Sequence, residues 1–296
     1  MRLSFALVIA LSVIAACQGD VAKAAQMIKF ATPDGPRQAI LLQAPGPGPN
    51  PTIFVLHSAT ISAQRLVHNS GFAAAAAAHG FTVVFPKGKQ RLWDDTRSGD
   101  QAHSNDAGFL DALAHQLIDA KIADPARIYL AGIANGGMMA FTMICHRDSL
   151  FAGVATIVAA LPAHLEQSCR PPKPLTVIMM NGTVDPVIPF RGGKVGFFGR
   201  HGKVLGVEQT AEIFAKAEDC TGKTKMPLPK RNKSESTHVN LFTWNGCTPH
   251  ASVHLYEVEG GGHQIPGGPT FLPFLLGSPN HDINAADEIL RLFSGS

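Results

Sequence analysis

Charge and long apolar runs are both scarce in this sequence. Only 16% of the 296 residues are charged and the formal net charge is +3, which is too small to imply a polyanionic partner, so we expect no nucleic-acid binding. After the N-terminal segment, no stretch approaches the roughly 20 apolar residues that a membrane span requires. No spacing of cysteine and histidine suggests a metal site. Because 45% of the residues are hydrophobic, the chain can bury a sizeable core in a large folded domain.

The N-terminus has the composition of an export signal. Arg2 supplies a positive start, residues 3–16 form a short apolar run, and Cys17 follows in the pattern of a bacterial lipobox. We therefore expect an export signal over 1–25, with removal of residues 1–16 and acylation of Cys17, and a single mature domain over 26–296. This predicts a periplasmic or outer-surface lipoprotein that meets the membrane only through its anchor. Ordinary cleavage near residues 22–25 is the alternative, and it would leave a secreted soluble product.

The four cysteines that remain form an even set, as is usual in an oxidising compartment. Three connectivities exist, and pairing in chain order is the one we predict, since it closes two loops of moderate length that each contribute ~3 kcal/mol. The pairs are then Cys145 with Cys169 and Cys220 with Cys247. Residues 221–240, rich in lysine, serine and proline, are expected to form an exposed excursion held at its base by the second pair.

Short runs of β-branched residues alternate with longer segments of helical periodicity. This pattern predicts βα units that build a mostly parallel sheet with helices on both faces, an α/β fold. Residues 26–50 precede the first parallel strand and predict an edge hairpin. Strands are expected over 52–57, 81–85, 128–132, 154–159, 176–181 and 253–258, and helices over 64–79, 106–120, 136–145, 207–217 and 285–293.

The segment 128–139 is an apolar strand, a glycine-flanked turn and an apolar helix, which is the setting of a nucleophile elbow. Glycines flank such a turn because it is sharp and strained, and a side chain there would collide with the strand or helix. The central residue is Ala134, whose methyl group cannot attack a carbonyl. Taken alone, the segment would be an ordinary βα turn.

Two further residues make the elbow interpretation stronger. Asp185 follows one predicted strand and His263 follows the last one, each in glycine-rich backbone. The order nucleophile, acid, histidine is that of α/β-hydrolases, and the ends of parallel strands meet at the edge where such sheets bind ligands. Asp185 would orient the imidazole, and His263 would carry the proton.

Together these motifs resemble the secreted polyhydroxybutyrate depolymerase and feruloyl esterase group of α/β-hydrolases, including its esterase lipoproteins. The resemblance implies an α/β-hydrolase fold and cofactor-free hydrolysis of a small-molecule or polymeric carboxylic ester through an acyl-enzyme. It places the oxyanion donors on the backbone of Asn135 and of the loop at Ser58 and Ala59. Trp93 is expected to line the cleft, although packing beneath a loop explains it equally well. The matching stretches are 56–57, 88–93, 106–109, 135–139, 182–189 and 260–263.

Three positions depart from the pattern of this group. The family has glycine where this chain has Ser58, serine where it has Ala134, and tryptophan where it has Ile265. Because all three positions lie at the expected site and the export signal is present, we interpret Ala134 as natural degeneration of the site and not as an engineered substitution.

Two functions follow from these observations. One is an ester hydrolase by ancestry, inactive as written, because loss of a triad serine costs roughly a millionfold in turnover. The other is a cell-surface pseudo-hydrolase that binds an ester or hydroxy-acid ligand. Ser58 as a displaced nucleophile is disfavoured, because it belongs to the loop that is expected to donate N–H groups. The sequence does not define the natural ligand or the oligomeric state.

Overall fold

The computed structural model describes residues 25–32, 35–97, 104–146 and 149–295. Cys17 and the predicted export signal over 1–25 lie outside these ranges, apart from residue 25 itself. In the described residues, no helix is long and apolar enough to cross a membrane. The lipoprotein and export predictions therefore stay predictions.

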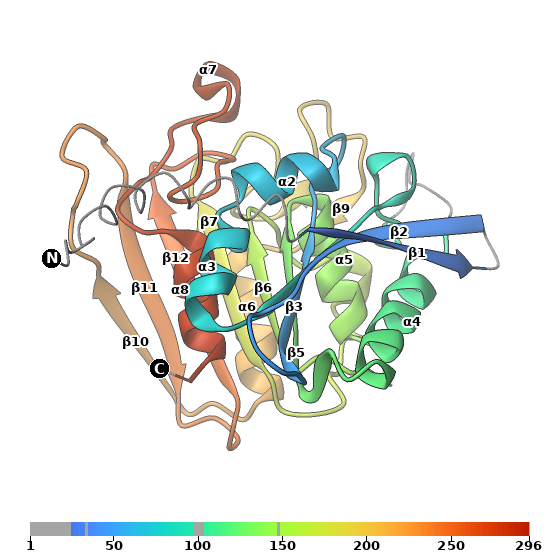
Figure 1. Ribbon diagram of the computed structural model, residues 1–296. Helices are drawn as coiled ribbons and strands as arrows, with labels where there is room; N and C mark the ends of the chain where they lie inside the picture. The colour runs from blue at the N-terminus through green and yellow to red at the C-terminus, as the bar shows by residue number, and fades with distance from the viewer. Residues whose placement is uncertain (1–24, 33–34, 98–103, 147–148, 296) are drawn as a thin grey trace, which may run out of the picture.

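A ten-stranded sheet forms the centre of the molecule, in the order β1-β2-β4-β3-β5-β6-β7-β12-β11-β10 (Figure 1). The six strands from β4 to β12 in this order run parallel, and antiparallel strands flank them on both sides. The strands are β1 (Gln26–Thr32), β2 (Gly35–Leu42), β3 (Asn50–Leu56), β4 (Thr82–Pro86), β5 (Ala123–Ile133), β6 (Gly153–Ile157), β7 (Thr176–Gly182), β10 (Gly222–Pro227), β11 (His238–Asn245) and β12 (Ser252–Glu259).

All six predicted parallel strands are present, and the pair β1 and β2 forms the predicted edge hairpin. The prediction succeeds because the central strands are covered on both faces, as parallel sheets are. Every residue of β4 and β6 is buried. The predicted fold class, a mostly parallel α/β sheet of the hydrolase type, is confirmed.

Helices cover both faces of this sheet. In Figure 1, α3 (Phe72–His79) and α8 (Ala285–Phe293) lie in front of it, and α5 (Asn135–Ile144) and α6 (Val207–Ala217) lie behind it. The helix α4 (Asp106–Asp119) packs beside β5. The predicted helix over 64–79 is two helices, α2 (Ala63–Asn69) and α3, because Gly71 has a φ of 77° and breaks the turn between them.

The segment 221–240 was expected to be an exposed excursion, and this prediction needs a correction. Its first part is the strand β10, which pairs with β11 and extends the sheet at its edge. The side chains of β10 are exposed throughout, so its lysine-rich sequence lacked the alternation of a half-buried strand. The disulfides Cys145–Cys169 and Cys220–Cys247 are both formed, which confirms the predicted pairing.

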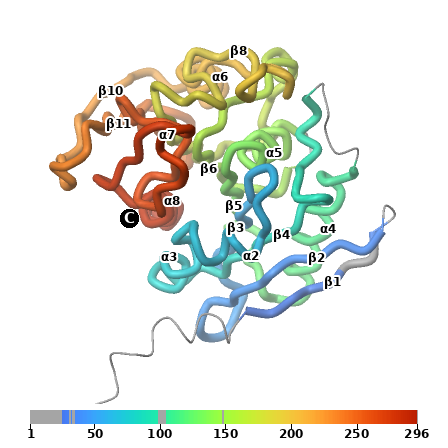
Figure 2. Tube along the Cα trace, turned by 90° about the horizontal axis from the view of Figure 1, so that it is seen from above, coloured from blue at the N-terminus to red at the C-terminus, as the bar shows by residue number. Residues whose placement is uncertain are grey.

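Long loops gather at the carboxyl ends of the parallel strands. They carry α7 (Pro273–Leu276) and a two-stranded hairpin of β8 (Gly193–Lys194) and β9 (Lys203–Val204). Seen from above in Figure 2, α2, α7 and β8 lie around this end of the sheet. This is the edge where open α/β sheets bind their ligands.

Candidate active site

Ala134 stands at a strained turn between β5 and α5. Its φ of 51° and ψ of −115° are a conformation that residues with a side chain rarely adopt. Its N–H donates to Ile157 O at 3.0 Å. A side chain on Gly132 would collide with the backbone of Gly136, and one on Gly136 would collide with the backbone of His57. The turn is therefore a nucleophile elbow in backbone geometry, with an alanine at its tip.

The elbow shares a cavity with His263, which is hydrogen-bonded to Asp185. His263 Nδ1 lies 2.7 Å from Asp185 Oδ2, as the sequence led us to expect. The other oxygen, Oδ1, accepts the backbone N–H groups of Val187 at 2.7 Å and Ile188 at 2.8 Å. Both carboxylate oxygens thus have fixed partners, so Asp185 can hold the imidazole in one orientation. Nε2 is then the ring nitrogen that is left for a ligand.

A cavity of about 620 Å³ lies above the elbow. Most of its lining side chains are apolar, and its size is that of a small-molecule binding site. It brings together residues that are far apart in the sequence and were predicted to meet at the site. These are Ser58, Ala59, Ala134, Asn135, His263 and Ile265.

Trp93 is not among the lining residues, so its predicted contact with the ligand is wrong. Its side chain is fully buried beneath the cavity. Its Nε1–H donates to His57 O at 2.9 Å, and its ring lies 4.9 Å from the His57 ring, centre to centre. Trp93 therefore packs under the loop at Ser58, which was the other explanation for it.

His57 has a role that the sequence did not reveal. Its Nε2 accepts the Gly88 N–H at 2.9 Å, so the proton resides on Nδ1, which donates to Ser58 O at 2.9 Å. Burial lowers the pKa of His57, which keeps the imidazole neutral. His57 is a positioning residue, since it holds the loop that carries Ser58 and Ala59. The only signal for it was its place beside Ser58 in a matching stretch.

A buried polar network supports the residue after the elbow. Asn135 Nδ2 donates to Asp95 Oδ2 at 2.6 Å. Arg97 donates to the same carboxylate from Nε at 2.8 Å and from Nη2 at 2.7 Å. Sequence reasoning missed Asp95 and Arg97, because no spacing linked them to the elbow 40 residues later.

Three residues that were predicted to donate backbone N–H groups line the cavity. Asn135 is the first residue of α5, where N–H groups have no partner inside the helix, and the positive end of the helix points the same way. Ser58 and Ala59 line the same cavity. The N–H of Thr60, the next residue, is not available to a ligand, because it donates to Arg91 O at 2.9 Å. Asn135, Ser58 and Ala59 therefore stay the predicted oxyanion donors.

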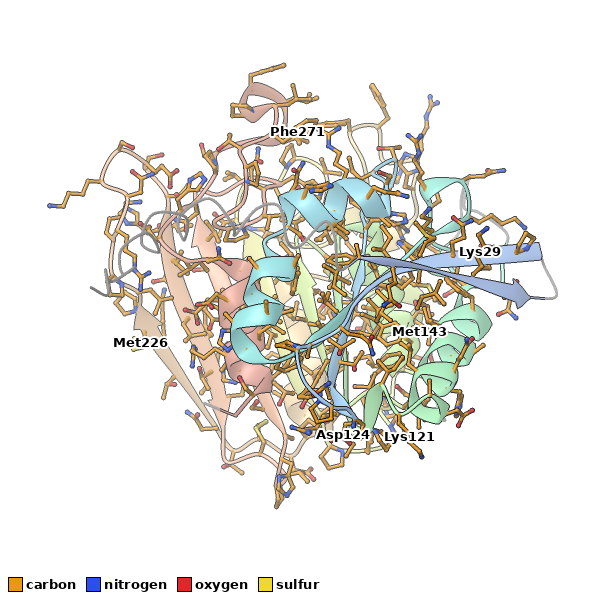
Figure 3. All side chains as sticks on the ribbon, in the orientation of Figure 1. Lys29, Lys121, Asp124, Met143, Met226 and Phe271 are labelled. Atoms are coloured by element: carbon orange, nitrogen blue, oxygen red, sulfur yellow. A yellow bond between two sulfur atoms is a disulfide. The ribbon has the colours of Figure 1, made fainter. Side chains whose placement is uncertain are left out.

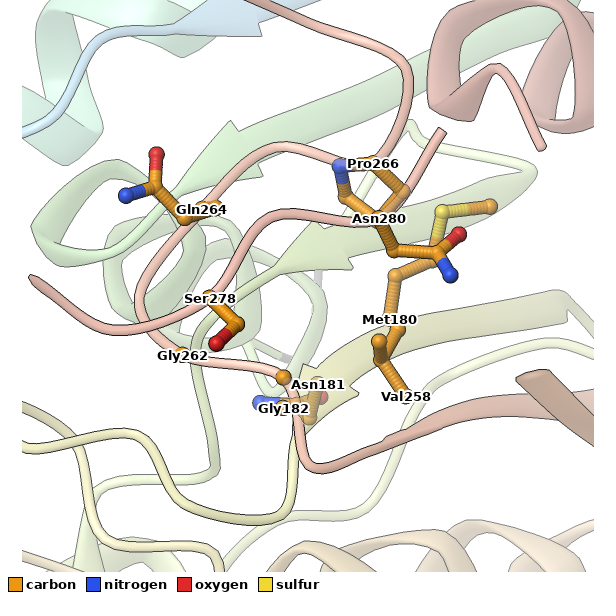
Figure 4. A pocket seen from close by; sticks show the side chains of 10 residues that line it. Met180, Asn181, Gly182, Val258, Gly262, Gln264, Pro266, Ser278 and Asn280 are labelled. Carbon is orange, nitrogen blue, oxygen red and sulfur yellow. The ribbon is translucent and has the colours of Figure 1, made fainter. Parts of the chain in front are cut away.

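A second, much smaller cavity lies beside the His263 loop (Figure 4). Its volume is about 10 Å³, enough for one water and too small for an ester. Asn181 Oδ1 lines it and has no hydrogen-bond partner in the described part of the chain. As for metals, no group of three or more histidine, cysteine, aspartate or glutamate side chains lies together among the described residues.

The known proteins that this chain resembles in sequence are esterases. No family model matches the chain. It is 27% identical over 263 residues to the putative esterase NocK of Nocardia uniformis subsp. tsuyamanensis, a match that covers 84% of this chain and 75% of that protein. It is 26% identical over 220 residues to feruloyl esterase B of Piromyces equi, where 72% of this chain matches 39% of the relative. The chain therefore spans well under half of this second relative.

The fold has solved counterparts. An acetyl xylan esterase from Aspergillus awamori superimposes with a TM-score of 0.58 at 13% identity, covering 92% of this chain and all of that one. A thermostable esterase superimposes with a TM-score of 0.53 at 14% identity, covering 93% of this chain and 61% of that one. These structures show the fold alone. Together with the sequence relatives, they confirm the resemblance to the feruloyl esterase group of α/β-hydrolases, and the chain is homologous to carboxylic-ester hydrolases.

Proposed function

We propose that this chain binds a carboxylic ester in the cavity above Ala134 and does not hydrolyse it. The observation that carries the proposal is the composition of the elbow: a methyl group occupies the position of the nucleophile, in the same cavity as His263, which is hydrogen-bonded to Asp185. A methyl group forms no acyl-enzyme, so the chemistry stops at binding. The chain is then a pseudo-hydrolase of esterase ancestry.

The rest of the site is suited to binding. Backbone N–H groups of Asn135, Ser58 and Ala59 can donate hydrogen bonds to the carbonyl oxygen of an ester. His263 Nε2 can meet the ester oxygen, and the apolar wall around Ile265 can cover the acyl part. None of these contacts requires a serine hydroxyl. A cavity of about 620 Å³ accommodates an aromatic acyl group more fully than an acetyl group.

The ester class follows from the relatives and from the cavity. One relative is named a feruloyl esterase, and another is named an acetylxylan esterase. The large apolar cavity favours an aromatic acid ester of the feruloyl kind, on a small alcohol or a polymer. The alternative is an ester of a short hydroxy acid, which the resemblance to polyhydroxybutyrate depolymerases predicts.

Methyl ferulate and p-nitrophenyl butyrate are suitable probes. We expect calorimetry to show saturable binding of methyl ferulate and spectrophotometry to show no release of p-nitrophenol above background. A Val187→Phe variant should weaken binding, because Val187 lines the cavity. Val184→Phe is the matched control, since Val184 is 60% exposed and does not line it. Absence of binding would refute the proposal, and rapid release of p-nitrophenol would reveal another nucleophile.

We further propose that the chain is exported as a lipoprotein. The two disulfides are consistent with an oxidising compartment. Mass spectrometry of the membrane fraction should find an acylated Cys17 at the new N-terminus. A free N-terminus at residue 26 or nearby would leave export intact and remove the anchor.

A further inference from the structure

The mouth of the large cavity has an apolar rim. Phe197 and Phe198 follow β8 and are 50% and 87% exposed, while Phe274 in α7 is 86% exposed. Phe271 and Leu272, just before α7, are also exposed. Because Phe197, Phe271 and Leu272 line the cavity as well, these exposed side chains are continuous with its mouth. We call the segments 191–203 and 271–275 together the rim.

Large side chains exposed in this way mark an interaction surface. Single exposed apolar residues are ordinary, but an apolar patch around the opening of a cavity is not. Elsewhere, Met226 on β10 is 54% exposed, and Figure 3 shows it well away from Phe271. Figure 3 also shows Phe271 beside α7, at the end of the molecule that lies opposite Lys121 and Asp124.

The rim is also basic. Between residues 187 and 205 the chain carries four exposed cations and no aspartate or glutamate. Residues 264–280 carry no charged side chain at all. From α2, the Arg65 guanidinium lies over the Phe271 ring, 5.1 Å from its centre. The four cations of the hairpin are Arg191, Lys194, Arg200 and Lys203.

We propose that the rim docks on an anionic lipid surface, with the mouth of the cavity toward the lipid. Phenylalanine and leucine side chains partition into the boundary between head groups and acyl chains, and basic side chains add attraction to anionic head groups. A neutral polyester carries no negative charge that the four cations could attract. Leucines beside the phenylalanines fit acyl chains better than stacked bases, and the charge complementarity selects an anionic bilayer.

This proposal goes beyond ester binding and differs from the expectation that the chain meets a membrane only through its acyl anchor. The test therefore uses residues 18–296, which lack both the apolar run 3–16 and Cys17, so that no acyl anchor can form. Sedimentation with vesicles of phosphatidylcholine, with and without phosphatidylglycerol, measures the docking. We expect at least tenfold stronger binding to the anionic vesicles and a marked loss of binding as salt rises.

Two double variants separate the two kinds of contact. Lys194→Gln with Arg200→Gln should weaken vesicle binding about 25-fold, since each basic residue near an anionic surface contributes about 1 kcal/mol and 1.4 kcal/mol is tenfold. Phe198→Ser with Phe274→Ser should weaken it at least tenfold. The matched control is Lys225→Gln with Met226→Ser, because both residues are exposed on the distant strand β10. This control should bind like the parent chain.

Three results would overturn the proposal: no vesicle binding, equal binding to uncharged vesicles, or equal loss in the control variant. A dimer in sedimentation velocity that dissociates on Phe198→Ser with Phe274→Ser would also overturn it, because the rim would then be a protein interface. Methyl ferulate binding, measured on the same variants without vesicles, tests the cavity separately. A failure of docking can therefore be told apart from a failure of ester binding.

Discussion

Trp93 and Asn135 are joined by a reciprocal pair of hydrogen bonds. The Trp93 N–H donates to Asn135 Oδ1 at 2.9 Å, and Asn135 Nδ2 donates to Trp93 O at 3.0 Å. Asn135 follows the elbow residue directly and lines the cavity. The pair therefore ties a predicted oxyanion donor to a buried loop 42 residues earlier in the chain.

Asn135→Ala should destabilise the fold by about 2–4 kcal/mol. The substitution leaves the Trp93 N–H and carbonyl without a partner in a buried place, and each such group costs about 1–3 kcal/mol, while Asp95 Oδ2 keeps its hydrogen bond from Arg97 Nη2. Urea unfolding followed by fluorescence measures the loss. Asn69→Ala is the control, since Asn69 is exposed at the mouth of the same cavity. Equal losses in both variants would contradict the network.

His57→Phe should weaken ligand binding although His57 does not touch the cavity. The Gly88 N–H and the Ser58 carbonyl lose their partner, at a cost of about 1–3 kcal/mol, and the loop at Ser58 and Ala59 is freed. Calorimetry with methyl ferulate measures the affinity, and His68→Phe on the surface of α2 is the control. Unchanged affinity would show that the loop holds its shape without His57.

The protonation of His57 makes the stability of the folded state depend on pH. Burial lowers the pKa of His57 below its ordinary 6.5, so the unfolded chain takes up a proton before the folded one as pH falls. The folded state is then favoured above pH 6.5 and loses this contribution as pH falls from 6.5 through the folded pKa. The free energy of unfolding of the parent chain should drop over this interval more than that of His57→Phe.

Glu218 carries a stability effect of the opposite sign. Burial raises its pKa from 4.5 to about 7. Between these values the folded state holds a proton that the unfolded state has lost, so stability is full below pH 4.5 and falls as pH rises toward 7. Glu218→Gln should therefore stabilise the protein by about 3 kcal/mol at pH 8 and change little at pH 4.5. Glu208→Gln, exposed on the same helix, should change stability little at either pH. A pH-independent effect at Glu218 would contradict the raised pKa.

Sequence reasoning found the parallel core because burial on both faces leaves a plain signal. Strands such as β6 are buried throughout, and the glycines at 132 and 136 mark a turn where side chains would collide. It missed β10, because that edge strand is exposed along its whole length. An exposed lysine-rich strand cannot be told from a loop by its hydrophobic pattern.

The residues of the site likewise fall into those that the sequence predicted and those that it did not. His263 and Asp185 each follow a strand, and parallel strands end at one edge, so their meeting was predictable. Asp95 and His57 act through hydrogen bonds to backbone and amide groups across the molecule, which no local spacing encodes. Trp93 could line the cleft or lie beneath it, and only the packing of the loops decided between the two.

Ala134→Ser tests how much of the esterase machinery remains. The new hydroxyl would lie opposite His263, which could accept its proton while the oxygen attacks an ester carbonyl, with Asp185 holding the imidazole. Ser58 and Ile265, the other two positions that depart from the family pattern, line the same cavity. A side chain at 58 disturbs the loop that donates to the oxyanion, and losing one such donor costs roughly a hundred- to a thousandfold. We therefore expect Ala134→Ser to give weak release of p-nitrophenol from p-nitrophenyl butyrate.

Adding Ser58→Gly and Ile265→Trp to Ala134→Ser should raise that activity clearly, since glycine lets the oxyanion loop lie close and tryptophan restores a flat wall for the acyl group. The control is Ala134→Ser with His263→Gln, which keeps the hydroxyl and removes the base, so its activity should return to background. Activity that survives this control would mean that the serine does not act through His263. Full esterase turnover from Ala134→Ser alone would show that positions 58 and 265 are harmless, and the interpretation of Ala134 as one of several degenerate positions would lose its main support.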